Sequence, residues 1–103
     1  MRVELLYFDG CPHYQRLLPR LTGLIEEIAP EAEVILRRIE TAGQAERERF
    51  LGSPSVRVDG VDVDPGAADR NEYGLECRLY RTGEETSPLP PDAWIRDALE
   101  RAV

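Results

Sequence analysis

The sequence predicts a single α/β domain over residues 1–103, with a four- to five-stranded mixed sheet and helices on both faces of the sheet. Three observations lead to this prediction. A short apolar run precedes a long amphipathic run, a second β-branched run follows, and a glycine-centred hairpin comes after a second helical segment. Short apolar runs indicate strands, whereas apolar residues spaced by about 3.6 indicate helices. A chain of this length buries about two-thirds of its unfolded surface, which is enough for one core.

The first predicted strand and helix follow one another directly. Residues 3–8 are apolar apart from Glu4, which is typical of a central strand covered on both faces. Residues 13–28 show helical spacing, and the proline inside this run, Pro19, predicts a kink. The apolar positions of this helix are Leu17, Leu18, Leu21, Leu24, Ile25 and Ile28.

A second strand and a second helix are predicted next. Residues 33–40 form a β-branched run, and because a helix separates them from the first strand, we expect the two strands to be parallel. Thr41 followed by Gln44 makes a capping box, which predicts the start of a helix. This helix is expected to end at Gly52.

The second half of the chain reads as β structure. Asp59-Gly60 lies between two short β-branched runs, as in a type I′ hairpin. Residues 65–74 are polar and turn-rich, so they predict a loop with room for one helical turn. Residues 75–80 alternate, with Leu75, Cys77 and Leu79 on one side, which predicts an edge strand with Cys77 on its buried side.

The chain is predicted to end in a helix. A proline-rich connector at residues 82–91 precedes a run with apolar residues at helical spacing, and prolines suit the first turn of a helix. The apolar positions are Trp94, Ile95, Ala98, Leu99 and Ala102.

The composition narrows the classes of partner and compartment. Thirteen basic and twenty acidic residues give a formal net charge of −7, which argues against nucleic acid or an anionic membrane as partner. Without a secretory signal or a long apolar stretch, the chain is expected in the cytoplasm, where two cysteines more often form a thiol site or bind a soft metal. Four aspartates lack the spacing of a calcium loop and are expected to be solvated. They are Asp59, Asp62, Asp64 and Asp69.

Cys11 lies where the first strand gives way to the first helix. The unpaired N–H groups and the dipole at a helix start stabilise a thiolate, and His13 is a possible cation nearby, whereas Asp9 opposes the thiolate. We therefore expect Cys11 to meet solvent as a reactive thiolate, the alternative being a small buried residue at the corner.

Each of the other candidate residues has more than one interpretation. Cys77 could resolve a mixed disulfide on Cys11 or fill the core. His13 could tune Cys11, bind a metal or be an ordinary residue at a helix start. Tyr14 could donate a hydrogen bond to the thiolate or pack in the first turn.

Several motifs resemble those of thioredoxin-like proteins. Cys11-Pro12-His13 resembles the start of the CPHC motif of bacterial disulfide oxidoreductases, and Pro19 has the offset at which thioredoxins carry a helix-kinking proline. Pro54, just before the third strand, resembles the cis-proline of that family. Together with the order of the elements, these motifs make nearly the whole chain similar to the thioredoxin-like fold.

Two details refine this resemblance. Tyr14 stands where the second cysteine of a CxxC motif would be, so a disulfide within the motif is impossible. The second half, with Gly-Ser-Pro before the hairpin and Cys-Arg-Leu-Tyr after it, is also similar to small thioredoxin-like proteins labelled as organomercurial-lyase relatives.

The resemblance implies a thiol–disulfide oxidoreductase or isomerase without a cofactor. Cys11 would attack a disulfide, His13 would favour its thiolate, and Cys77 or an external thiol would resolve the mixed disulfide. Partners would be proteins or low-molecular-weight thiols and disulfides. A soft-metal protein of the mercury-binding type and a non-catalytic interaction domain remain as alternatives. Residues implied to contact the substrate are Pro12, Tyr14, Ser53 and Pro54.

Overall fold

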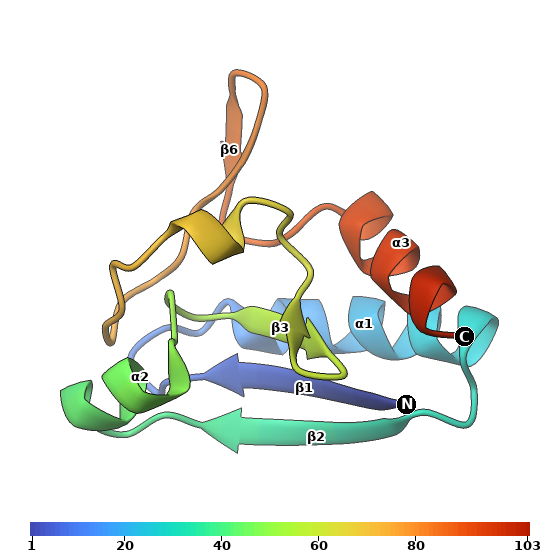
Figure 1. The fold of residues 1–103 in the computed structure, drawn as a ribbon, viewed down its shortest axis with the longest axis horizontal. Coiled ribbons are helices and arrows are strands. Elements are labelled where there is room, and N and C mark those ends of the chain that lie inside the picture. The colour runs from blue at the N-terminus through green and yellow to red at the C-terminus, as the bar shows by residue number, and fades with distance from the viewer.

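The computed structural model describes residues 1–103 and places four strands in one mixed sheet (Figure 1). The strand order is β2-β1-β3-β4; β1 is parallel to β2 and antiparallel to β3, and β4 is antiparallel to β3. The predicted central position of the first strand and the parallel pairing of the first two strands are thus confirmed. The strands are β1 (Arg2–Tyr7), β2 (Glu33–Arg38), β3 (Ser55–Val58) and β4 (Val61–Asp62).

Three α-helices cover the two faces of the sheet. Side chains alternate between faces along a strand, so Leu5 and Leu6 of β1 point in opposite directions. Leu5 belongs to the larger apolar core, which it shares with α1 and α3, whereas Leu6 packs with Ala45 of α2 in a smaller core. None of these helices is long and apolar enough to cross a membrane. The helices are α1 (Tyr14–Ile28), α2 (Ala42–Glu48) and α3 (Asp92–Ala102).

Glu4, in the middle of β1, is buried on the face of the sheet opposite to α1, where it belongs to an ion-pair network. Arg37 Nη1 lies 2.9 Å from the Glu4 carboxylate, and Arg37 Nη2 lies 2.9 Å from that of Glu48. The hydrogen bond between Arg37 and Glu48 lowers the pKa of the Glu48 carboxyl and raises the pKa of Arg37. A buried carboxylate in the central strand is therefore compensated by charge from the neighbouring strand.

The ends of the helices follow local sequence signals, with one correction. The side-chain oxygen of Thr41 accepts a hydrogen bond from the Gln44 N–H at 3.0 Å, as predicted for the start of α2. However, α2 ends at Glu48 and not at Gly52, because Arg49 adopts a left-handed conformation with φ 55°. Helix α1 continues through Pro19.

Two turn predictions in the middle of the chain are confirmed. Asp59 and Gly60 have φ values of 50° and 85°, both positive as a type I′ turn requires, and they join β3 to β4. The loop that follows contains a single 3₁₀ turn, η1 (Ala67–Asp69).

The predicted edge strand at residues 75–80 does not form, although Tyr80 begins the short strand described below. Residues 75–79 pair only through an isolated bridge from Cys77 to Ser53, and their alternation is the reverse of the predicted one. Arg78 is buried, whereas Cys77 and its apolar neighbours Leu75 and Leu79 are exposed. The polar partners of Arg78, described below, explain this reversal.

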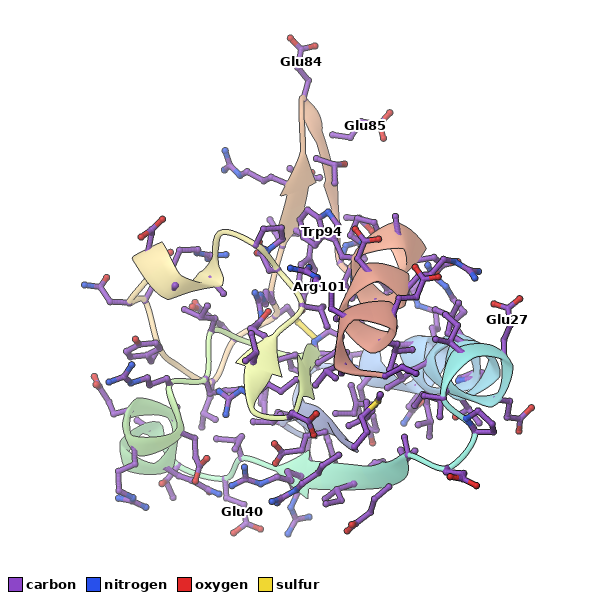
Figure 2. All side chains as sticks on the ribbon, turned by 45° about the vertical axis from the view of Figure 1, so that its right-hand side comes forward. Glu27, Glu40, Glu84, Glu85, Trp94 and Arg101 are labelled. Atoms are coloured by element: carbon purple, nitrogen blue, oxygen red, sulfur yellow. A yellow bond between two sulfur atoms is a disulfide. The ribbon has the colours of Figure 1, made fainter.

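The proline-rich connector contains a hairpin that was not predicted. Strands β5 (Tyr80–Thr82) and β6 (Glu85–Ser87) pair in a separate two-stranded ribbon, which projects from the rest of the fold (Figure 1). Gly83 makes the turn with φ 64°. Glu84 and Glu85 lie at the free end of this hairpin (Figure 2).

Candidate functional site

The two cysteines form a disulfide between segments 66 residues apart in sequence (Figure 2). Their Cα atoms are 5.7 Å apart, an ordinary separation for bonded cysteines. Cys11 follows the carboxyl end of the central strand β1, and Cys77 lies in the segment at residues 75–79, which we call the Cys77 segment. The fold therefore brings together the two residues that sequence analysis singled out as nucleophile and resolving partner.

Cys11 is fully buried, so the expectation that it meets solvent was wrong. It lies two residues before His13, the N-cap of α1, and its N–H donates to the Phe8 carbonyl oxygen at 3.2 Å. Its Sγ lies 3.5 Å from the Ser53 carbonyl oxygen. The Cys77 side of the disulfide is the exposed side.

The backbone beside Pro54 is occupied by the Cys77 segment. The Ser53–Pro54 peptide bond is cis, and both residues are buried. The Ser53 N–H donates to the Glu76 carbonyl oxygen at 2.8 Å, and the Arg78 N–H donates to the Ser53 carbonyl oxygen at 2.9 Å. The resemblance implied that Ser53 and Pro54 contact the substrate; instead the chain's own segment pairs with the Ser53 backbone.

Gly52 permits this close approach. Its φ is +122°, and a Cβ atom built on it would lie 3.0 Å from the Glu76 carbonyl oxygen and 3.0 Å from the Arg78 Cβ atom. Any other residue at this position would be strained and would push against the backbone of the Cys77 segment. Glycine here is therefore a requirement of the contact between the two segments.

The Arg78 side chain fixes the Cys77 segment from the inside. Its guanidinium is fully buried and donates to both Asp62 carboxylate oxygens, at 2.7 and 3.1 Å, and to Asp64 Oδ2 at 3.2 Å. Nη1 also donates to Ser55 Oγ at 2.9 Å. The Asp62 and Asp64 side chains are only 14% and 11% exposed, so the prediction that they are solvated was wrong. They neutralise the buried cation.

Tyr80 completes this polar cluster. The Arg78 guanidinium carbon lies 4.4 Å from the centre of the Tyr80 ring, and the Tyr80 hydroxyl donates to the Pro54 carbonyl oxygen. Burial raises the pKa of the Tyr80 hydroxyl, so it stays neutral and keeps this proton. Burial acts against the charge of Arg78, but Tyr80, Asp62 and Asp64 outweigh it and raise its pKa. Arg78 is therefore a permanent cation.

His13 lies beside a second basic side chain. Arg16 Nη2 lies 2.7 Å from His13 Nδ1. A guanidinium can only donate, so a hydrogen bond at this contact uses Nδ1 as the acceptor. The opposing carboxylate, Asp9, is exposed and pairs with Arg38 at 3.2 Å.

The remaining predicted residues lie around the first turn of α1. The Tyr14 ring stacks on Tyr7 of β1 with a centroid distance of 4.1 Å and an interplanar angle of 21°, which is a packing role. Pro12 is exposed beside it. Neither contact involves a sulfur atom.

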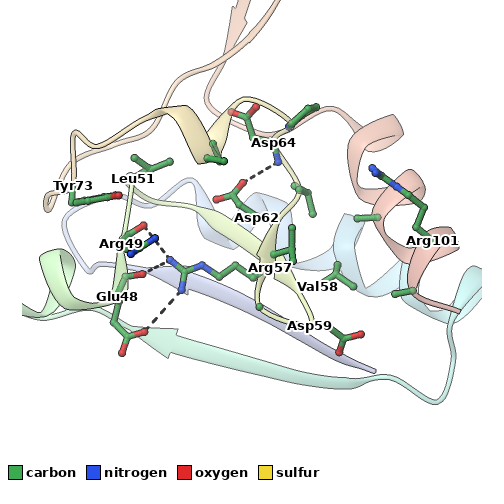
Figure 3. A pocket seen from close by; sticks show the side chains of 18 residues that line it. Glu48, Arg49, Leu51, Arg57, Val58, Asp59, Asp62, Asp64, Tyr73 and Arg101 are labelled. Atoms are coloured by element: carbon green, nitrogen blue, oxygen red, sulfur yellow. Dashed lines mark hydrogen bonds and ion pairs between the residues drawn. The ribbon is translucent and has the colours of Figure 1, made fainter.

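Two cavities differ in their relation to the disulfide. The larger, about 710 Å³, surrounds the β3–β4 hairpin and contains neither cysteine; Figure 3 shows Arg57 reaching from this hairpin to Glu48 and to the Arg49 backbone. The smaller, about 300 Å³, is also lined by neither cysteine, but its lining includes Gly10, directly before Cys11, and Leu75, two residues before Cys77. We place the candidate site at the disulfide itself, with the smaller cavity formed by residues that neighbour the cysteines in the chain.

Three potential metal ligands also meet at the disulfide. The ligand atoms of Cys11, His13 and Cys77 all lie within 4.8 Å of one another. Sulfur and imidazole nitrogen suit soft or borderline cations such as Hg²⁺ and Zn²⁺. The sulfurs could serve as ligands only in the reduced protein, because a metal binds the thiolate.

Sequence reasoning missed the buried cluster around Arg78. The signal was the alternation of Arg78 and Tyr80 on one side of a short segment, with two acidic residues at the nearby hairpin. An arginine that alternates with an aromatic residue can face inward when carboxylates meet it. Asp62 and Asp64 supply these carboxylates.

Comparison with known proteins returned no similar protein: no family model, no curated protein and no solved structure matches the chain. The function is therefore inferred from the residues and the geometry described above.

Proposed function

We propose that this protein is a thiol–disulfide oxidoreductase with a thioredoxin-like fold, in which Cys11 and Cys77 form the redox couple. The observation that supports this most strongly is the disulfide itself, which joins the end of the central strand to an exposed segment. A disulfide with one fully buried and one exposed cysteine can exchange with thiols from solvent on one side only. A merely structural crosslink does not require this asymmetry.

The architecture is in keeping with the thioredoxin-like assignment. The cysteine lies between the central strand β1 and helix α1, and Ser53-Pro54 lies against it just before β3. Tyr14 occupies the position of the second motif cysteine, and Cys77 supplies a second sulfur from a distant part of the chain. The redox couple is therefore assembled by the fold and not by a CxxC motif.

The reaction is a two-electron exchange. The reduced protein gives two electrons and two protons to a partner disulfide, which becomes two thiols, while the Cys11–Cys77 bond forms. External thiols reverse this step by attacking the disulfide and becoming oxidised themselves. The reducing thiol pool of the cytoplasm, where we expect the protein, would regenerate the dithiol.

Partners in this proposal are protein disulfides or low-molecular-weight disulfides. The small cavity beside the Cys77 segment gives a partner a place to lie, with Arg38 and Glu40 offering both charges and Leu75 an apolar contact. No cofactor is needed, because both electrons come from sulfur.

Catalysed reduction of insulin by dithiothreitol tests the proposal. The wild-type protein is expected to accelerate the appearance of reduced insulin chains, and Cys11→Ser and Cys77→Ser are each expected to lose this acceleration, because each leaves only one sulfur of the couple. Glu84→Gln, at the free end of the β5–β6 hairpin, is the control and should keep the activity, since it leaves both sulfurs and the residues around them unchanged. A wild-type rate equal to the rate in buffer would contradict the proposal.

A second candidate function is the capture of a soft metal ion by the reduced protein. It is favoured by the convergence of two sulfurs and one imidazole within 4.8 Å. Thiolates bind soft cations strongly, and a buried sulfur protects the bound ion from competing ligands.

Titration of the reduced protein with Hg²⁺ separates the two functions. Stoichiometric binding that is lost in both cysteine variants and weakened in His13→Ala, together with no acceleration of insulin reduction, would favour metal capture. Acceleration of insulin reduction, together with Hg²⁺ binding that His13→Ala does not weaken, would favour the oxidoreductase.

A further inference from the structure

We propose that Cys77, and not Cys11, is the sulfur that attacks the partner disulfide and is attacked by external thiols. This inference rests on the proposed function and reverses the roles that the sequence suggested. Cys77 is then the catalytic nucleophile, and Cys11 is the resolving residue.

The two cysteines differ in their access to solvent. Thiol–disulfide exchange requires a thiolate to approach one sulfur from the side opposite the bond that breaks. Cys11 is 0% exposed, so a thiol in solvent has no path to its sulfur. Cys77 is exposed, so the Cys77 side of the disulfide is the side that faces solvent.

The Cys77 segment does not move aside readily to uncover Cys11. The segment is held independently of the disulfide, by two main-chain hydrogen bonds to Ser53 and by the buried guanidinium of Arg78. Arg78 directly follows Cys77 and is bound by both Asp62 and Asp64. Releasing it would leave a charge or carboxylates without partners in the interior, which is costly. Reduction of the disulfide therefore leaves Cys77 above Cys11.

The surroundings of the two sulfurs also differ. The Cys11 sulfur lies 3.5 Å from the Ser53 carbonyl oxygen, the acceptor to which a Cys11 thiol would donate, and the residue is fully buried. Cys77 is exposed, so its sulfur is the one available to a partner.

Oxidation of the protein by a partner disulfide proceeds through two attacks, the first by Cys77 and the second by Cys11. The Cys77 thiolate attacks one sulfur of the partner disulfide; that bond breaks, and the other partner sulfur leaves and takes a proton from solvent. Cys11 then loses its proton and attacks Cys77 Sγ, which forms the Cys11–Cys77 bond. The remaining partner sulfur leaves and is protonated. In the reverse direction an external thiolate attacks Cys77 Sγ, and Cys11 is the leaving group.

Single-cysteine variants test this order. Reduced Cys11→Ser, which keeps Cys77, and reduced Cys77→Ser, which keeps Cys11, are mixed with 5,5′-dithiobis(2-nitrobenzoic acid), and the released thionitrobenzoate is followed by absorbance. Because reactivity follows access and thiolate fraction, we expect Cys77 to react at least about tenfold faster than Cys11. A Cys11 that reacts as fast as Cys77, or faster, in folded protein would overturn the proposal.

Unfolding provides the control. In guanidinium chloride both thiols become accessible, so the two rates should converge; urea unfolding curves establish that each variant is folded in buffer. A difference that persists unchanged in denaturant would come from local sequence and would contradict a role for burial.

Asp64→Asn, combined with each single-cysteine variant, tests whether the Cys77 segment shields Cys11 from solvent. Asp64→Asn in the Cys77→Ser background removes one charged contact of Arg78 while the bidentate contact to Asp62 remains. Cys11 should then react several-fold faster in folded protein, and Cys77 in the Cys11→Ser background should change little. An unchanged Cys11 rate would show that the Cys77 segment is not what shields it.

The failure of this inference and the failure of the proposed function are distinguishable. If wild-type protein accelerates insulin reduction but Cys11 reacts faster, only the order of attack is wrong. If wild-type protein does not accelerate insulin reduction, the oxidoreductase function is wrong whichever thiol reacts faster.

Discussion

The two halves of the disulfide are built in different ways. Cys11 is placed by the β1–α1 frame, which is held by apolar packing: Leu5 of β1 and Leu17 and Leu21 of α1 are fully buried in one core. Cys77 is placed by a segment without regular secondary structure, held by main-chain pairing to Ser53 and by the charged contacts of Arg78.

This difference concerns the alignment of the two sulfurs. Apolar packing is non-directional and tolerates small shifts, whereas hydrogen bonds to a planar guanidinium fix position and orientation. Both regions therefore stabilise the fold, but the cluster around Arg78 also determines whether the two sulfurs meet. Changes in the two regions should lower stability alike and differ in their effect on the redox equilibrium.

The largest effect is expected for Arg78→Met. Removing the guanidinium leaves the carboxylates of Asp62 and Asp64 without their cation, so the free energy of unfolding of the reduced protein should fall by about 3–5 kcal/mol. Urea unfolding measures this change. Arg38→Met is the matched control: it removes an exposed arginine that also contacts two carboxylates, and its effect should be far smaller. Equal effects of the two substitutions would refute the structural role of the buried cluster.

Reduction of the disulfide should have an effect of similar size. Closing a loop with a sequence separation of 66 residues restricts the unfolded chain and stabilises the fold by about 4 kcal/mol in the chain-entropy model. Urea unfolding of oxidised and reduced wild-type protein measures the difference. The reduced protein should match Cys77→Ser, and oxidised protein no more stable than reduced protein would contradict the prediction.

A substitution in the frame should change stability without changing the redox equilibrium. Leu21→Ala removes a fully buried side chain of α1 and should lower the free energy of unfolding by about 3 kcal/mol. In a glutathione buffer in which both forms stay folded, its ratio of oxidised to reduced protein should equal that of wild type. Asp64→Asn should instead shift this ratio toward the reduced form, because it loosens the Cys77 segment. A shift of the same size in both variants would remove the distinction between the two regions.

The smallest effect concerns the ion pair between Glu48 and Arg37, away from the disulfide. Because the folded protein lowers the pKa of Glu48, this pair stabilises the fold above the carboxyl pKa of the unfolded chain. That stabilisation is lost as the pH falls through the pKa that Glu48 has in the folded protein. Its size should be about 0.5 kcal/mol or less, since the pair is partly solvated. Glu48→Gln should reduce the loss of stability between pH 6 and pH 3, and Glu46→Gln, an exposed control on the same helix, should not.

The sequence predicted the parts of the fold that depend on near neighbours. Asp59-Gly60 and Thr41 act within a few residues, so their turn and cap could be recognised directly. The position of Cys11 after β1 was predicted for the same reason, but its burial was not, because the residues that cover it come from distant segments.

The sequence-based prediction was wrong where an ion pair with a distant residue outweighed the local alternation of polar and apolar residues. Alternation placed Cys77 inward, but the pairing of Arg78 with Asp62, 16 residues away, turns that face inward and Cys77 outward. Such reversals are expected at positions where a buried ion pair competes with apolar burial.

The most direct test of the central claim is a titration of the folded protein in buffers of reduced and oxidised glutathione, quenched with acid and read by intact mass. The account predicts one reversible transition in which the protein loses two hydrogen atoms as the Cys11–Cys77 bond forms, with no lasting glutathione adduct. A bond that stays closed in excess reduced glutathione would make it a permanent crosslink. That result, or glutathione adducts in place of the bond, would contradict a redox couple made by Cys11 and Cys77.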